Sequence, residues 1–139
     1  MSKDRHPLEP VIRVIAMPAD TNPHGDIFGG WLMAQMDLAA GSVATRHAKG
    51  RSATVAVDGM SFLAPVSVGD EVSVYACLVA TGESSMRIAV EAWRRARHGD
   101  AEQKVTEAEY VFVAIDAKGR KRRVEALSDP RRDREEEDD

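Results

Sequence analysis

The sequence contains one cysteine, Cys77, among 139 residues, and aromatic side chains make up only 5% of it. A single cysteine excludes an internal disulfide framework and fits a reducing compartment. Cys77 has no histidine close to it in sequence, so we expect an inert, packed thiol. The chain also lacks a G-x-S-x-G motif, a glycine-rich phosphate loop, a C-x-x-C pair and an H-E-x-x-H motif, and its four histidines lack metal-ligand spacing. These absences argue against serine-hydrolase, nucleotide and zinc chemistry, and we expect no metal and no cofactor.

Charge and terminal composition set the expected domain limits. Residues 129–139 hold seven acidic and three basic side chains and thereby account for the whole net charge of -4. We expect an N-terminal extension over residues 1–9, one domain over residues 10–125 and a charged, disordered tail over residues 126–139. The first ten residues lack the apolar stretch of a signal peptide, which favours a cytoplasmic protein. Nucleic-acid binding is disfavoured because the body has no net positive charge.

One long segment is almost free of charge. The nineteen residues between Asp26 and Arg46 contain a single ionisable side chain, Asp37. A helix that is apolar all round is expected to be buried, so this carboxylate should be paired, neutralised or held in a cleft for chemistry. The stretch is about long enough to cross a bilayer, but its glycines, its serine, Gln35 and Asp37 argue against a membrane span.

Local signals place the other elements around this helix. Asp26 is expected to cap the helix start, and the basic residues and glycine at 46–50 to end it. Apolar residues then alternate with a period of two, and short turns separate the alternating segments, which favours an antiparallel meander. We expect an α+β domain in which the sheet curls around the helix, and an oligomer that buries the remaining apolar helix surface. The expected strands are 11–17, 54–63, 72–78, 86–95 and 105–116, followed by a hairpin-like turn at 116–119.

The chemistry that remains is centred on Asp37. Gly29 and Gly30 lie near the helix start, where free amide groups can stabilise an oxyanion, and Asp37 follows about two turns later. A carboxylate near such donors can activate water or attack a carbonyl group. The pattern alone leaves the alternative that Asp37 pairs with a buried arginine.

Two segments of the sequence resemble a known family. Residues 17–37, M-P-A-D-T-N-P-H-G-D-I-F-G-G-W-L-M-A-Q-M-D, and residues 55–70, V-A-V-D-G-M-S-F-L-A-P-V-S-V-G-D, are similar to hotdog-fold acyl-CoA thioesterases of the bacterial YciA type. The similarity runs from roughly Val11 to Arg123. It implies a long central helix wrapped by a five-stranded antiparallel sheet, dimers whose sheets join edge to edge, and a homohexamer built as a trimer of dimers. It also implies hydrolysis of acyl-CoA to free CoA and a carboxylic acid.

The same resemblance implies roles for residues near the helix start. Asp37 matches the helix carboxylate that acts as general base or nucleophile, and Asn22 matches a loop asparagine contributed by the other subunit of the dimer. A backbone amide of Gly29 or Gly30 would polarise the thioester carbonyl. His24 and Gly25 belong to the same loop and are candidates for substrate contact, with loop hydrogen bonding as the alternative role of His24.

Other positions keep two interpretations. Ser84, Ser85, Arg94 and Arg95 are candidates for binding the CoA phosphates or pantetheine, as are Arg97, Lys118 and residues 120–123, although all of these equally fit solvated strand ends. Asp58 is expected to form a structural salt bridge or hydrogen bond. The acyl chain could be lined by residues that equally fit core packing, namely Trp31, Met33, Met36 and Phe62.

Two rival functions remain open from the sequence. A dehydratase or hydratase of the same fold would act on acyl thioesters, but that chemistry normally uses a histidine base. A non-catalytic acyl-CoA-binding module would have no need of a buried carboxylate opposite oxyanion donors.

Overall fold

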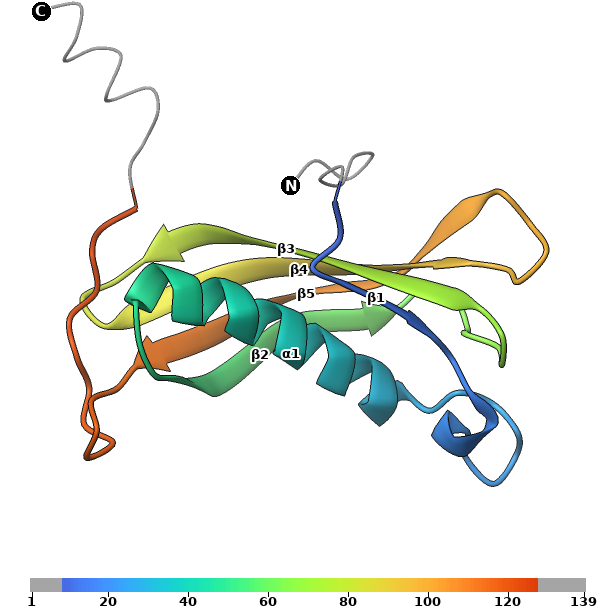
Figure 1. The fold of residues 1–139 in the computed structure, drawn as a ribbon, viewed down its shortest axis with the longest axis horizontal. Helices are drawn as coiled ribbons and strands as arrows, with labels where there is room; N and C mark the ends of the chain where they lie inside the picture. Colours follow the sequence, from blue (N-terminus) through green and yellow to red (C-terminus); the bar gives the residue numbers. More distant parts are fainter. Residues whose placement is uncertain (1–8, 128–139) are drawn as a thin grey trace, which may run out of the picture.

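The computed structural model describes residues 9–127, so most of the expected N-terminal extension and charged tail lies outside the described residues. One long helix and five strands confirm the expected α+β architecture (Figure 1). The order is β1 (Ile12–Ile15), a short 3-10 helix (Pro18–Asp20), α1 (Gly29–Ala48), β2 (Ser52–Phe62), β3 (Glu71–Thr81), β4 (Ser85–Arg95) and β5 (Glu102–Ala114).

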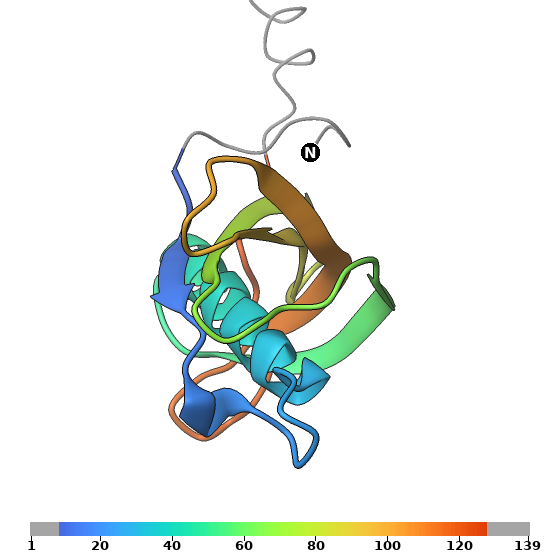
Figure 2. The ribbon, with the colours of Figure 1, turned by 90° about the vertical axis from the view of Figure 1, so that its right-hand side faces the viewer.

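The five strands form one antiparallel sheet in the order β1-β3-β4-β5-β2. Seen along the length of α1, the sheet curves around the helix, as the sequence predicts (Figure 2). The expected meander is correct for β3, β4 and β5 but wrong for β2, which pairs with β5 instead of β3. The reason is the connection from Leu63 to Asp70, which is long enough to cross from one edge of the sheet to its other half. The strand β2 therefore lies at an edge of the sheet.

The start of α1 differs from the sequence prediction. The helix begins at Gly29, two residues later than the apolar run, and its N-cap residue Phe28 makes no side-chain capping hydrogen bond. The expected cap Asp26 lies two residues before Phe28 and is therefore not a cap, because the loop and not a side chain positions the first turn. The helix ends as expected in its basic last turn, where Lys49 adopts the left-handed conformation at a φ of 55°.

The core lies between α1 and the concave face of the sheet. One row of mostly small helix residues is buried against it, namely Leu32, Met36, Ala39, Ala40, Ala44 and Ala48. The spacing of three and four residues is that of a single helix face. The prediction that the helix is buried all round is wrong for the single chain, because Leu38 on the opposite face is 61% exposed. One curved sheet covers only the face that it contacts.

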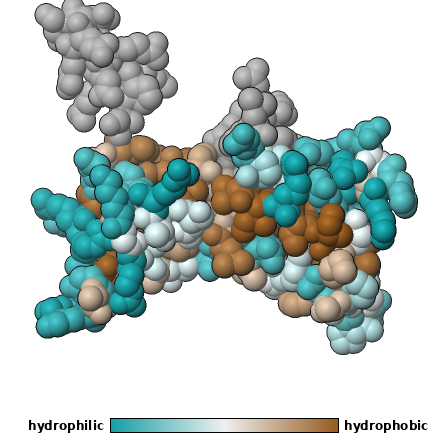
Figure 3. Space-filling view, viewed as in Figure 1, coloured by the Kyte–Doolittle hydropathy of each residue, from teal (hydrophilic) through white to brown (hydrophobic). Residues whose placement is uncertain are grey.

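The molecule is polar at its two ends, and hydrophobic residues gather over the middle of the face seen in Figure 3. Within residues 9–127, no helix combines the length and the apolar character needed to cross a membrane.

Candidate active site

Asp37 lies near the middle of α1 and faces β2. The hydroxyl group of Thr54 in β2 donates a hydrogen bond of 2.6 Å to Asp37 Oδ1. The two residues line a cavity of about 580 Å³ together with Leu38, Gly41, Ser42, Thr45, Arg46, Ser52 and Phe112. Asp37 is half-buried, so its carboxylate can be reached from this cavity, which we call the Asp37 cavity.

The partners of Asp37 decide between the two interpretations that the sequence leaves open. Within residues 9–127, no arginine or lysine forms an ion pair with Asp37, and Thr54 supplies its side-chain hydrogen bond. The alternative in which a buried arginine neutralises this carboxylate is therefore wrong for the described chain. A carboxylate that is held by a neutral hydroxyl and open to a cavity keeps lone pairs for a proton or a substrate.

Sequence reasoning did not find Thr54. Thr54 is an exposed residue in the alternating row of β2, and the sequence contains no signal that pairs it with a residue seventeen positions earlier. The contact exists because β2 returns alongside the helix at the edge of the sheet.

A buried tyrosine lies close to the same turn of α1. The hydroxyl group of Tyr110 in β5 donates a 2.9 Å hydrogen bond to the backbone carbonyl of Met33. Burial, and second to it the negative charge of Asp37, raise the pKa of Tyr110 to about 12. The phenol therefore keeps its proton throughout the neutral range.

The loop before α1 is organised by Asn22. Its side-chain oxygen accepts the backbone amides of His24 at 2.9 Å and Asp26 at 3.1 Å, and its own backbone amide donates to the carbonyl of Asp26. Gly25 closes this turn at a φ of 88°, a conformation that favours glycine. Because Asn22 Oδ1 already accepts two hydrogen bonds within the loop, the side-chain NH2 group is the part of Asn22 that can contribute to chemistry.

Gly29 and Gly30 occupy the first positions of α1. A side chain at Gly29 would lie 3.0 Å from the ring of Phe62, and one at Gly30 would lie 3.2 Å from the ring of Phe28. The absence of side chains at both positions allows these rings to pack against the first turn of the helix. Eight residues separate Gly29 from Asp37, which is about 12 Å along the helix axis. Within one chain the structure therefore does not bring the glycines and Asp37 to the same point.

A second cavity of about 530 Å³ lies beside the helix start. Its walls come from the start of α1, from the end of β2 and the segment after it, and from β5. The lining residues include Phe28, Gly29, Leu32, Phe62, Ala64 and Val105. Of the residues expected to line an acyl chain, Phe62 lines this apolar cavity, whereas Met36 is fully buried in the core.

Comparisons with known proteins agree with this geometry. The model of the thioesterase superfamily matches residues 24–100, which is more than half of the chain. The chain belongs to the thioesterase superfamily.

This thioesterase is similar to individual proteins in sequence and in structure. It is 48% identical over 115 residues to the acyl-CoA thioester hydrolase YciA of Escherichia coli, covering 81% of this chain and 87% of that protein. The hexameric thioesterase y2039 of Yersinia pestis superposes with a TM-score of 0.81 at 49% identity, covering 86% of this chain and 97% of that one. A hexameric hotdog-fold thioesterase of Campylobacter jejuni gives 0.79 at 35% identity, covering 84% and 90%. The fold is the hotdog fold.

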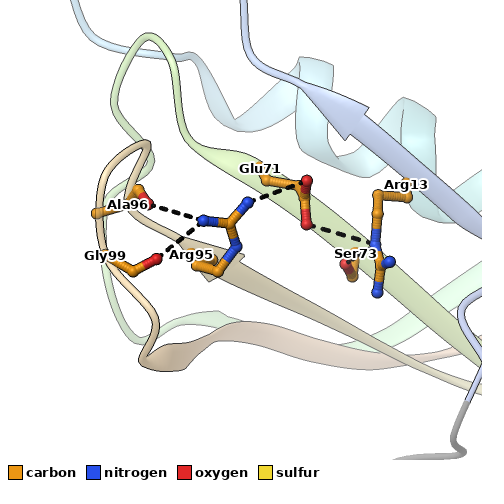
Figure 4. A network of polar contacts seen from close by, with 6 residues as sticks. All are labelled: Arg13, Glu71, Ser73, Arg95, Ala96 and Gly99. Carbon is orange, nitrogen blue, oxygen red and sulfur yellow. Dashed lines mark hydrogen bonds and ion pairs between the residues drawn. The ribbon is translucent and has the colours of Figure 1, made fainter.

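The thioesterase separates the residues suggested for CoA binding. Ser84 directly precedes β4 and Ser85 begins it, whereas Arg94 and Arg95 end it, so the two pairs lie roughly 30 Å apart for a strand of this length. Arg95 donates to the carbonyl of Gly99 at 2.8 Å and forms an ion pair with Glu71 at 3.2 Å (Figure 4). Arg94 pairs with the buried Asp70 at 3.1 Å. One chain therefore cannot use both groups for the same phosphate, and the CoA-binding role of all four residues stays a prediction.

Asp58 has the structural role that was expected of it. Its carboxylate pairs with Arg87 at 3.2 Å, and Arg87 also pairs with Glu109 at 3.0 Å. This ion-pair network lies on the neighbouring strands β4, β5 and β2, away from the Asp37 cavity.

The hydrogen bond from Thr54 leads to a first testable prediction. Replacing Thr54 with valine keeps the shape of the side chain but removes the donor to Asp37, so we expect kcat to fall about 10-fold. The control Thr81→Val removes a threonine hydroxyl from β3, three strands away from β2 in the sheet, where it accepts the Leu127 amide, and it should leave kcat unchanged. Steady-state thiol release measures both variants. Equal kcat values for the Thr54 variant and the unmodified enzyme would contradict a role for this bond.

Proposed function

We propose that this thioesterase hydrolyses acyl-CoA to free CoA and a carboxylic acid. The observation that carries the proposal is the carboxylate of Asp37, which accepts a hydrogen bond from Thr54, has no cationic partner among the described residues and opens into a cavity. Two of the proteins compared above support it, a relative described as an acyl-CoA thioester hydrolase and a structure described as a hexameric thioesterase.

The reaction would use Asp37 in one of two ways. As a general base it takes a proton from water, the resulting hydroxide attacks the thioester carbonyl, and the collapse of the tetrahedral intermediate expels the CoA thiolate, which is then protonated. As a nucleophile it attacks the carbonyl itself, expels the thiolate and forms a mixed anhydride that water then hydrolyses. In both routes an amide of Gly29 or Gly30 stabilises the oxyanion.

The active unit of the proposal is a dimer. The first amides of α1 point along the helix axis, away from the Asp37 of the same chain, so the oxyanion donors that serve this Asp37 belong to a second copy. Asn22 would be contributed in the same way. The edge strand β2 offers unpaired backbone groups, and its exposed Val55 and Val57 would pair with the same strand of the partner. Because two of the compared structures are described as hexamers, we further propose a trimer of such dimers.

The apolar cavity beside Gly29 would receive the acyl chain. It adjoins the proposed oxyanion donors, and its volume lies within the range of small-molecule sites. Replacing Ala64 with phenylalanine would fill part of this cavity, and we expect kcat/KM for long acyl chains to fall roughly 10-fold more than for short ones. Ala117→Phe, which adds the same ring in the turn after β5, should change neither. A uniform loss over all chain lengths would contradict this assignment.

The assay that tests the function is thiol release from short-, medium- and long-chain acyl-CoA by the purified full chain. Thioester hydrolysis releases one thiol per substrate. Conversion of 3-hydroxyacyl-CoA or enoyl-CoA without thiol release would instead identify a dehydratase or hydratase, and binding without turnover would identify an acyl-CoA-binding module. The single cysteine favours the cytoplasm as the place of this reaction.

A further inference from the structure

Tyr110 connects the turn of the helix that carries Asp37 to the middle of the sheet. The side chain is 1% exposed, and its hydroxyl donates to the carbonyl of Met33 at 2.9 Å. In an α-helix this carbonyl also accepts the backbone amide of residue 37. The phenol therefore binds the same backbone oxygen that holds Asp37 in its helical turn.

A second contact fixes the following turn. Phe112 lies two residues after Tyr110 on β5, and so on the same face of the sheet. A side-chain carbon built at Gly41 would lie 3.5 Å from the ring of Phe112, an ordinary van der Waals distance, so this turn of α1 lies close against β5. Asp37 lies midway between Met33 and Gly41 along the helix. The helix is thus held on the sheet both before and after the carboxylate.

The same two residues of β5 also determine where Thr54 lies. In the pairing of β2 with β5, Thr54 lies opposite Phe112, and Val57 lies opposite Tyr110. A shift of α1 along β5 would therefore change the distance between Asp37 and Thr54 directly. The hydrogen bond of 2.6 Å between Thr54 and Asp37 requires α1, β2 and β5 to keep their positions relative to one another.

We propose that Tyr110 is a positioning residue of the thioesterase: its hydroxyl, by binding the Met33 carbonyl, holds Asp37 at the distance from Thr54 that catalysis requires. The inference rests on the proposed function, because it assigns Tyr110 a role in the action of Asp37. The raised pKa of Tyr110 supports it, because a phenol that keeps its proton remains a hydrogen-bond donor at every pH at which a carboxylate base works.

Tyr110→Phe tests this inference, because it removes the hydroxyl and keeps the ring in the core. We expect kcat to fall about 10-fold with KM changed less than about twofold, the pattern of a displaced catalytic group. The matched control is Tyr75→Phe. Tyr75 is also 1% exposed, but its hydroxyl lies beside Arg13 and Ser73 on the other half of the sheet, so its loss should lower thermal stability without changing kcat.

A double-mutant cycle separates positioning from mere stability. If Tyr110 acts by placing Asp37 against Thr54, Tyr110→Phe should have little further effect on kcat in the Thr54→Val enzyme. Additive losses in the cycle would overturn the inference, as would an unchanged kcat in the Tyr110→Phe variant. Failure of the proposed function is recognised separately, because Asp37→Asn would then retain activity whatever the outcome of the cycle.

Discussion

Replacing Asp37 with asparagine is expected to lower kcat by about 10²–10⁴-fold, the usual range for a positioned acid–base group. The amide keeps the size of the side chain and can still accept a hydrogen bond from Thr54, but it can neither take a proton at neutral pH nor attack a carbonyl group. The fold should persist, because Asp37 is half-buried and takes part in no ion pair of the described chain. Thiol release under saturating acyl-CoA measures the effect.

The matched control is Asp100→Asn, which makes the same chemical change at an exposed residue between β4 and β5. It should retain full activity. Circular dichroism and thermal unfolding of both variants establish that each is folded. A folded Asp37→Asn enzyme that releases thiol at a near-normal rate would rule out the proposed mechanism, since among residues 9–127 no other carboxylate lines the Asp37 cavity.

Mixed oligomers are expected to recover activity that neither parent variant has. If Asn22 and Asp37 of different subunits form each active site, a dimer of one Asn22→Asp and one Asp37→Asn subunit contains one site with both residues intact. Random pairing of equal amounts should then give about a quarter of the normal activity. Asn22→Asp suits the experiment because it keeps the oxygen that accepts the amides of His24 and Asp26 and replaces the side-chain NH2 donor by a carboxylate oxygen.

Co-expression with two different affinity tags isolates the mixed species. The control is the Asp37→Asn variant carried on both tags, which should stay inactive. No recovery in oligomers shown to contain both tags would mean that Asn22 and Asp37 of the same subunit form each site, whereas an active Asn22→Asp parent would mean that Asn22 has only its loop role.

Most of the fold could be predicted from residue patterns. The apolar run that contains Asp37 predicted the helix, and alternation with a period of two predicted the four long strands, because side-chain periodicity follows directly from local backbone geometry. The predicted helix start was wrong because aspartate is a common N-cap residue, whereas the loop held by Asn22 places the first helical residue at Gly29. The pairing of β2 was wrong because no local signal distinguishes a neighbour along the chain from a strand across the sheet.

The candidate site was predicted only in part. A lone carboxylate in an uncharged helix and two glycines near the helix start are visible in the sequence, and the resemblance supplied Asn22. Thr54 and Tyr110 were not found, because their contacts with α1 depend on how β2 and β5 pair. The serines and arginines suggested for CoA binding were separate candidates in the sequence, and only the extent of β4 shows how far apart they lie.

The sequence by itself determined that this chain has one long helix with a single carboxylate, followed by alternating strands, since both properties depend on neighbours a few residues apart. Only the tertiary structure decided what surrounds that carboxylate. A hydroxyl from β2 and an open cavity meet at Asp37, and a phenol from β5 binds the preceding turn, because strands distant in sequence pair beside the helix. The free energy that selects this pairing comes from the packing of the whole core.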